Sequence, residues 1–231
     1  MGEFSRDDLT CVDAYCGSVV DHLHIQGCAV RIVADLGEWF REIKAHTPEL
    51  VINYAFDPRR NRVVRSHFFG TIVTRDGELV GRSAVRLVVT EDFVDEVATM
   101  RLWGNRVRRN GRLDCIVLPE DVPPQRGRIC HEGALWVERA HRRKGLGTTL
   151  LQLMRGVAIA AWQPNWINGI ARDHIVDAGV SHNAYGMRAV PIVEGYSPVV
   201  DEHVKLYLTY TTPREVVASM KCRVRDRYAA E

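Results

Sequence analysis

A basic turn with two glycines separates an apolar run from a helix-like run in the second half of the sequence. It reads Arg142-Arg143-Lys144-Gly145-Leu146-Gly147 and follows Leu135-Trp136-Val137. Glycines in such a turn let an anion approach the backbone, and the first amides of the following helix can donate to it. The helix dipole and the basic side chains favour negative charge at the same place. We therefore predict that this turn binds a diphosphate.

Two other phosphate-binding motifs do not describe this turn. A dinucleotide-binding turn reads G-x-G-x-x-G, and a Walker loop reads G-x-x-x-x-G-K followed by Ser or Thr. The sequence instead places Arg142, Gly145 and Gly147 in the pattern Q/R-x-x-G-x-G/A, and in this respect it resembles the GNAT N-acetyltransferases. The resemblance is specific over residues 128–210, where strand, turn, helix, strand and helix follow in the family's order, and it is topological over residues 28–89.

The resemblance implies an α/β (mixed α+β) fold, in which helices flank a mixed, mostly antiparallel sheet with one parallel, splayed pair of strands. It implies acetyl-CoA, or another acyl-CoA, as co-substrate and no metal. The acceptor would be a primary amine of a small molecule or peptide that attacks the thioester directly. Residues implied to bind the cofactor are Leu135, Trp136, Val137, Arg142, Arg143, Lys144, Gly145, Leu146, Gly147 and Thr148. Asn183 is implied to bind the amide groups of the cofactor.

Amine attack on a thioester needs a base for the amine and an acid for the departing thiolate. Family members often carry a carboxylate base on the strand before the turn, where this chain has His131 and Glu132. Neighbouring strand residues point to opposite faces, so we expect only one of them to face the substrate, and we prefer Glu132. A solvated glutamate or a core histidine is the alternative.

The acid is harder to place, because the chain departs from the family pattern. Relatives often have a tyrosine on the last helix before a Gly-aromatic step, but here His182 occupies the corresponding position and Tyr185 directly precedes Gly186-Met187. We expect either Tyr185 or His182 to protonate the thiolate. A tyrosine packed in the core is the alternative.

Periodicity and turn signals predict the elements that position these residues. An N-terminal accessory helix, with Asp13 as its N-cap and Gly27 at its end, occupies residues 1–27. A single GNAT-like domain follows over residues 28–231, with an insertion at about 91–127 that contains a helix from Phe93 to Leu102. The predicted elements are strand 28–33, helix 36–45, a hairpin over 70–89 with its turn at Asp76-Gly77, strand 129–137, helix 147–162, strand 166–171, helix 176–185, strand 190–193 and strand 204–210.

Composition argues for an ordinary globular protein. The 231 residues contain 31 Lys and Arg against 29 Asp and Glu, a net charge of +2 that is too small to indicate nucleic acid or a membrane, and we expect neither as a partner. The six cysteines form no C-x-x-C pair and the N-terminus shows no export signal, so we expect free thiols in the cytoplasm. A homodimer is the default expectation for assembly.

An arginine cluster stands out within the predicted insertion. Arg101, Arg106, Arg108, Arg109 and Arg112 form the densest run of charge in the chain. A solvated loop explains such a run, and so would recognition of an acidic substrate, of the 3′-phosphate of coenzyme A or of RNA.

Two other functions remain open at this stage. The chain could resemble the acyl-homoserine lactone and N-acyl amino acid synthases, because residues 76–87 and Glu132 are similar to their arrangement, although those proteins generally lack the R-x-x-G-x-G turn. It could also keep the fold and bind coenzyme A without turnover, since its tyrosine is displaced.

Overall fold

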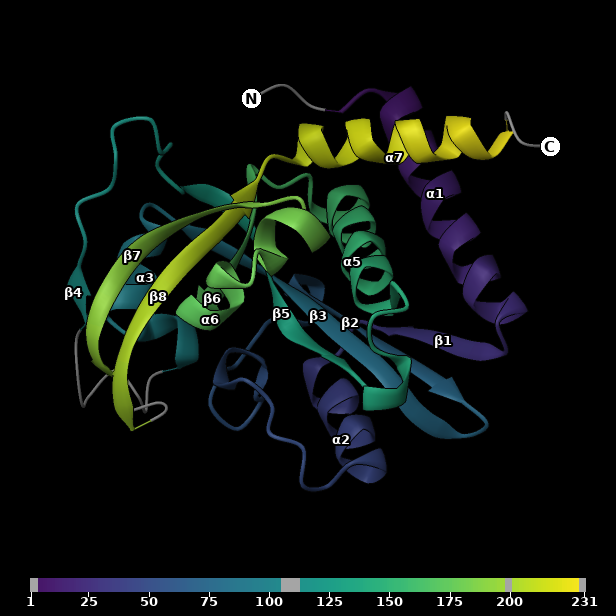
Figure 1. Cartoon of the computed structure of the whole chain (residues 1–231), viewed down its shortest axis with the longest axis horizontal. Coiled ribbons are helices and arrows are strands. Elements are labelled where there is room, and N and C mark those ends of the chain that lie inside the picture. Colours follow the sequence, from purple (N-terminus) through teal and green to yellow (C-terminus); the bar gives the residue numbers. More distant parts are fainter. Residues whose placement is uncertain (1–3, 105–112, 198–200, 229–231) are drawn as a thin grey trace.

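The strands form one eight-stranded sheet (Figure 1). A computed structural model describes residues 4–104, 113–197 and 201–228. The strands are β1 (Cys28–Val33), β2 (Phe68–Arg75), β3 (Glu78–Thr90), β4 (Asp114–Cys115), β5 (Gly127–Val137), β6 (Trp166–Arg172), β7 (Arg188–Ser197) and β8 (Glu202–Thr211). Their order is β1-β2-β3-β5-β6-β8-β7-β4, in which β5 and β6 are parallel and the other neighbours antiparallel. The predicted mixed, mostly antiparallel sheet is confirmed.

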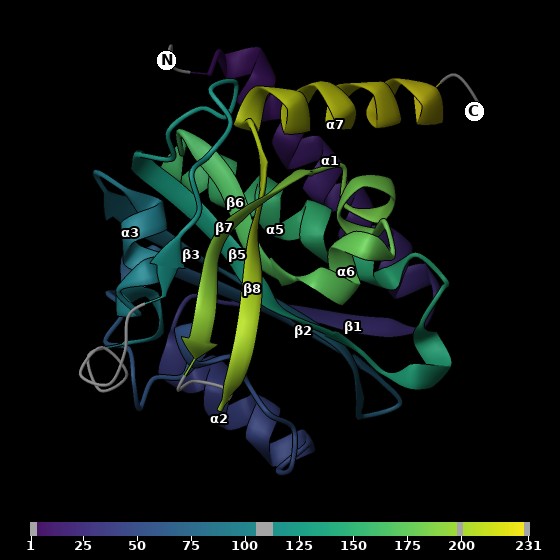
Figure 2. The ribbon, with the colours of Figure 1, turned by 60° about the vertical axis from the view of Figure 1, so that its left-hand side comes forward.

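Helices cover both faces of this sheet (Figure 2). They are α1 (Arg6–Ile25), α2 (Leu36–His46), α3 (Phe93–Ala98), α5 (Leu146–Trp162), α6 (Asp173–Asp177) and α7 (Pro213–Tyr228). Short turns are the 3₁₀ segments η1 (Tyr54–Phe56), η2 (Arg65–His67), η3 (Arg101–Trp103) and η4 (Arg139–His141), and the π-helical η5 (Val180–Ala184). One core holds α2 and α3 against the sheet, and a second core on the opposite face holds α1, α5 and α7. Within the described ranges, no helix has the length and apolar character needed to span a membrane.

The N-terminal helix begins earlier than the sequence suggested. Ser5, not Asp13, is its N-cap, because the Ser5 side chain accepts from the Asp8 backbone while the Asp8 carboxylate accepts from the Ser5 backbone. Its end was predicted correctly, since Gly27 adopts a left-handed φ of 77° directly after the helix. The helix packs along α5 and α7 through Val12, which is fully buried.

The first-half hairpin is confirmed. β2 and β3 pair antiparallel around Asp76 and Gly77, whose φ values of 52° and 83° belong to the tight turn that such a dipeptide favours. β3 then continues beside β5 as far as Thr90. The hairpin therefore supplies the long edge against which β5 is held.

Two predicted helices have other boundaries, and a third helix was not predicted. The helix predicted over residues 176–185 is two short pieces, because Gly179 takes a left-handed φ of 68° between α6 and η5. The helix predicted over 93–102 stops at Ala98, because Met100 is also left-handed. The sequence reading did not find α7.

Residues 91–127 contribute to the sheet and its core. Phe93 and Val97 are fully buried, and β4 pairs with β7 at the far edge of the sheet. Arg101 binds Asp95 and Glu96. The other four arginines of the cluster lie outside the described residues.

Candidate active site

The two parallel strands separate after a short stretch of pairing. β5 and β6 are paired only where Ile129–His131 meets Trp166–Asn168. Beyond that point β5 follows β3 to Val137, while β6 follows β8 to Arg172. One edge of β5 after His131 thus has no partner strand within the described chain. The predicted splay is confirmed.

A β-bulge distorts this free edge. Ala134 has a φ of 51°, and the register between β3 and β5 shifts between Arg82 and Ala84. The Arg82 guanidinium donates to the Ala134 carbonyl over 2.7 Å. Arg82 is buried, and burial lowers its pKa to about 10. The bulge is therefore fixed by a buried cation.

A cavity of about 320 Å³, here called the splay cavity, opens between the separated strands. Its walls combine the free edge of β5, the facing edge of β6, residues from α5, η3, α6, η5 and β8, and the residues that cap η1 and η5. They are Asn53, Leu102, Trp103, His131, Glu132, Gly133, Ala134, Leu135, Leu151, Gly169, Ile170, Ala171, Arg172, His174, Ile175, Ser181, Tyr185 and Thr209. The structure thus brings three of the four candidate catalytic residues, Glu132, His131 and Tyr185, to one cavity.

Glu132 points towards α5 and forms a buried ion pair. Arg155 Nε and Nη2 donate to its two carboxylate oxygens, each over 2.8 Å, and Nη1 donates to the Tyr185 carbonyl over 2.7 Å. Burial opposes the charge of Arg155, but the Glu132 carboxylate outweighs it and raises the pKa of the guanidinium. Arg155 was not among the predicted site residues, although an arginine among apolar positions of a helix is a signal for such a pair.

His131 points to the opposite face, as strand alternation requires. Its ring stacks on Phe56 and tilts against Phe93, at centroid distances of 5.8 and 5.5 Å. Burial, helped by the nearby charge of Arg86, lowers the pKa of His131 to about 3. Nδ1 lies 3.1 Å from Asn168 Oδ1, and in the tautomer that carries its proton on Nδ1 this nitrogen donates to the amide oxygen. The neutral ring thus keeps a lone pair on Nε2, which makes no hydrogen bond to the described residues.

The π-helical turn η5 decides which candidate acids reach the cavity. Ser181 and Tyr185 line it, whereas His182 and Asn183 are exposed and do not. The structure therefore does not bring His182 or Asn183 to the splay cavity. Burial and the neighbouring Glu132 raise the pKa of Tyr185, so its phenol stays protonated near neutral pH. Ser181, which sequence reasoning missed, is buried with a hydroxyl that has no hydrogen-bond partner among the described residues.

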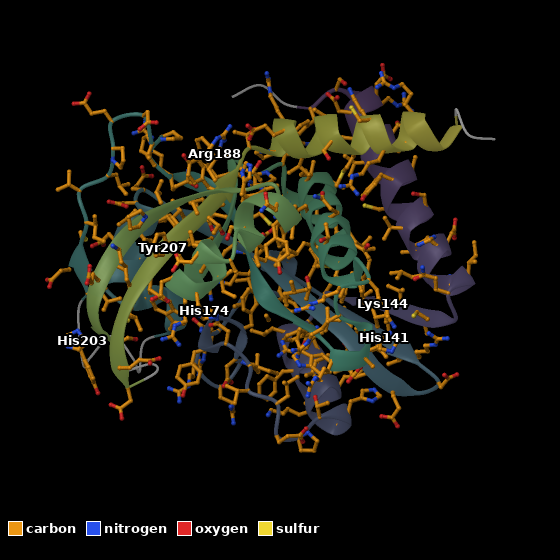
Figure 3. The ribbon with its side chains drawn as sticks, viewed as in Figure 1. His141, Lys144, His174, Arg188, His203 and Tyr207 are labelled. Atoms are coloured by element: carbon orange, nitrogen blue, oxygen red, sulfur yellow. The ribbon has the colours of Figure 1, made fainter. Side chains whose placement is uncertain are left out.

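The glycine turn joins the end of β5 to α5, and Figure 3 shows His141 and Lys144 together at this point. Gly145 has a left-handed φ of 83° and is the N-cap of α5, without a side-chain cap. The amides of Leu146, Gly147 and Thr148 have no acceptor in the described part of the chain. A Cβ placed on Gly147 would meet only Val137 and Leu135, at ordinary contact distances of 3.6 and 3.7 Å. The helix start thus presents free donors to solvent, and Arg142, Arg143 and Lys144 are exposed beside it.

Comparison with known proteins agrees with this geometry. A model of the acetyltransferase (GNAT) family matches residues 33–161, more than half of the chain. No curated protein sequence matches the chain.

Solved structures resemble the chain at low identity. An Arabidopsis thaliana NAA60 in complex with acetyl-CoA is 14% identical with a TM-score of 0.49, covering 80% of this chain and 98% of that one. A GNAT-family acetyltransferase from Streptococcus pneumoniae is 12% identical with a TM-score of 0.46, covering 80% and 99%. A spermidine N-acetyltransferase from Vibrio cholerae is 10% identical with a TM-score of 0.47, covering 83% and 96%.

Proposed function

Because the chain belongs to the GNAT acetyltransferase family, we propose that it transfers an acetyl group from acetyl-CoA, or another acyl group from its CoA thioester, to a primary amine. One observation carries this proposal. The backbone amides without acceptors at the start of α5 follow the end of β5, and the unpaired edge of β5 leads from there to the splay cavity. A long ligand with an anionic end and an extended amide-containing arm would satisfy both.

The residues present fit coenzyme A. The amides of Leu146, Gly147 and Thr148 would bind its diphosphate, with Arg143 and Lys144 adding charge. The edge of β5 from Leu135 to Val137, where the Val137 carbonyl already accepts from Arg142 Nε, would pair with the amides of its arm as another strand would. When bound, the group supplies an activated thioester carbonyl.

Residues around β5 have different roles in the direct attack. Nε2 of neutral His131 accepts a hydrogen bond from the attacking amine, which forms the C–N bond as the C–S bond breaks. With a pKa of about 3, His131 orients the amine but does not hold its proton, which passes to water in the cavity. Tyr185 donates a proton to the departing thiolate and regains one from the water that received the amine proton.

Glu132 is the weaker candidate for the base, although the sequence favoured it. Arg155 donates to both of its oxygens, and the pair faces α5, away from Phe56 and Phe93. We assign Glu132 a positioning role: through Arg155 it holds the carbonyl of Tyr185, and with it the end of η5.

The experiment combines cofactor binding with turnover. Calorimetry measures acetyl-CoA uptake, and thiol release measures transfer to a panel of amines. In Gly147→Asp, the carboxylate stabilises the first turn of α5 but repels a diphosphate, so we expect a folded protein that neither binds acetyl-CoA nor turns over. Gly17→Asp is the matched control, because Gly17 is exposed on α1 with open space around it.

The outcomes separate the alternatives. Uptake by wild type and Gly17→Asp, lost in Gly147→Asp, supports the cofactor turn. No uptake by well-folded wild type removes the enzymatic proposal. Uptake without transfer to any amine would leave a coenzyme A-binding protein that does not catalyse acyl transfer.

A further inference from the structure

A second cavity continues outward from the splay cavity. It measures about 280 Å³, is here called the outer cavity, and shares Asn53, Trp103, Ile170 and Arg172 with the splay cavity. Its other walls are mainly apolar, formed by Val51, Ile52, Tyr54, Val204 and Leu206. An acceptor whose amine lies in the splay cavity would therefore place the rest of its body among apolar side chains.

The charges around the two cavities disfavour a polycation. No carboxylate lines the outer cavity in the described chain, and the splay cavity has only Glu132, which is paired with Arg155. The charged side chain that lines both cavities is Arg172, which donates to the Glu202 carboxylate over 2.5 Å, and buried Arg82 donates to the backbone of Val51 at the cavity wall. An amine with further positive charges would lose hydration here, and the carboxylates near it, Glu132 and Glu202, already have arginine partners.

Two aromatic residues shape the outer cavity. Trp103 lies at its junction with the splay cavity, and Tyr54 lies on its wall with the Arg60 guanidinium 3.7 Å from its ring centroid. Flat rings pack against such side chains in offset or edge-on arrangements. An aromatic body would use both the shape and the apolar character of this cavity.

We propose that the acceptor is a small primary amine carried on an uncharged aromatic body, with the amine in the splay cavity and the ring in the outer cavity. This inference rests on the proposed acyl transfer and names its substrate class. The chemistry is unchanged: the amine nitrogen bonds to the acyl carbon as the C–S bond breaks, the amine proton passes to water, and the thiolate takes a proton from Tyr185, which water restores.

The test compares tryptamine and phenethylamine with spermidine and with a peptide that has a free N-terminus. With acetyl-CoA as donor, we expect kcat/KM for the two aromatic amines to exceed that for spermidine or the peptide by at least about tenfold. Val204→Trp, which narrows the outer cavity at a residue that does not line the splay cavity, should raise KM for tryptamine while leaving KM for acetyl-CoA unchanged.

A charge placed at the cavity rim tests the electrostatic part. Val51 is 81% exposed, so Val51→Asp should fold, and it should move the tryptamine-to-spermidine ratio of kcat/KM towards spermidine by about fivefold. Val64→Asp is the matched control, because Val64 is 61% exposed and lines neither cavity. Its ratio should equal that of wild type.

The results distinguish a failure of this inference from a failure of the proposed function. Preference for spermidine or the peptide, or equal ratios in Val51→Asp and Val64→Asp, would overturn the aromatic acceptor while leaving N-acyl transfer intact. Failure to bind acetyl-CoA, or absence of thiol release with every amine, would overturn the proposed function and this inference with it.

Discussion

Replacing Arg155 with methionine should expose how much the site depends on one buried ion pair. The side chains of Arg155 and Glu132 are 1% and 6% exposed, and two hydrogen bonds of 2.8 Å join them. Methionine keeps much of the apolar length of arginine but none of its donors. Arg155→Met therefore leaves the Glu132 carboxylate buried without its cation and frees the Tyr185 carbonyl.

The cost follows from that burial. Removing one partner of a buried pair typically destabilises a protein by about 3–5 kcal/mol, because the remaining charge has no compensation. For a chain of this size each kcal/mol lowers Tm by about 2–4 °C, so Tm should fall by about 6–20 °C. Replacing both residues, as Glu132→Leu with Arg155→Met, removes the stranded charge and should recover all but about 1–2 kcal/mol.

The assay is a double-mutant cycle on the free energy of unfolding in urea. The coupling energy between the two residues should reach at least about 2 kcal/mol. Arg188→Met is the matched control, because Arg188 pairs with Glu215 but the two side chains are 56% and 44% exposed. That loss should stay below about 1 kcal/mol.

Activity of the double variant then separates positioning from base catalysis. If Glu132 only positions η5, the folded double variant keeps kcat within about tenfold of wild type and the pH profile keeps its shape, whereas loss of a true general base would cost about 10²–10⁴-fold. A coupling energy near zero would refute the buried pair, and the larger loss of kcat would refute our assignment of Glu132.

Three further changes follow from the same geometry. Gly147→Ala should keep or raise the free energy of unfolding by about 0.5 kcal/mol, since a Cβ has room there. It should weaken acetyl-CoA binding in calorimetry by about tenfold. Unchanged affinity would contradict a close approach of the diphosphate to this glycine. The pKa of His131 is lowered from 6.5 to about 3, so between these pH values the unfolded chain binds a proton that the folded chain does not. The contribution of His131 to the free energy of unfolding should therefore be fully present above pH 6.5 and should fall by about 1.4 kcal/mol per pH unit on acidification below it. Urea unfolding of His131→Gln should show a smaller slope. Gly156→Ala would place a Cβ 2.3 Å from Cys16 Sγ and should lower the free energy of unfolding, measured by thermal unfolding, by about 1–3 kcal/mol. The double variant that adds Cys16→Ala should be more stable than Gly156→Ala alone.

The features predicted correctly are those that the sequence encodes locally. Asp76-Gly77 specifies a hairpin because both residues accept positive φ, and the glycine turn specifies a helix start that lies next to its own strand. The parallel pair follows from strand, helix and strand in succession. Even α7 carries a local signal, since Pro213 is its first residue, a position that favours proline.

The features that could not be predicted depend on contacts distant in sequence or on the phase of a helix. Glu132 and Arg155 are 23 positions apart and meet only once α5 packs on the sheet. A continuous helix through residues 176–185 would have kept His182 as a candidate acid, but left-handed Gly179 resets the phase and turns Ser181 and Tyr185 inward. Propensity alone cannot fix that phase, because tertiary packing decides where a short helix breaks.

The buried arginines around β5 give the site a common electrostatic character. Arg155 has a carboxylate partner, but Arg82 and Arg86 donate to backbone carbonyls, and burial lowers the pKa of each to about 10. Nearby positive charge disfavours protonation of His131, which keeps it an acceptor for the amine. The same charge would favour the negative charge that develops on the acyl oxygen and on sulfur during transfer, because preorganised cations act more strongly away from water. It would also disfavour acceptors that bring several positive charges of their own. Binding of the anionic transition state and preference for a singly charged amine would therefore have one physical cause.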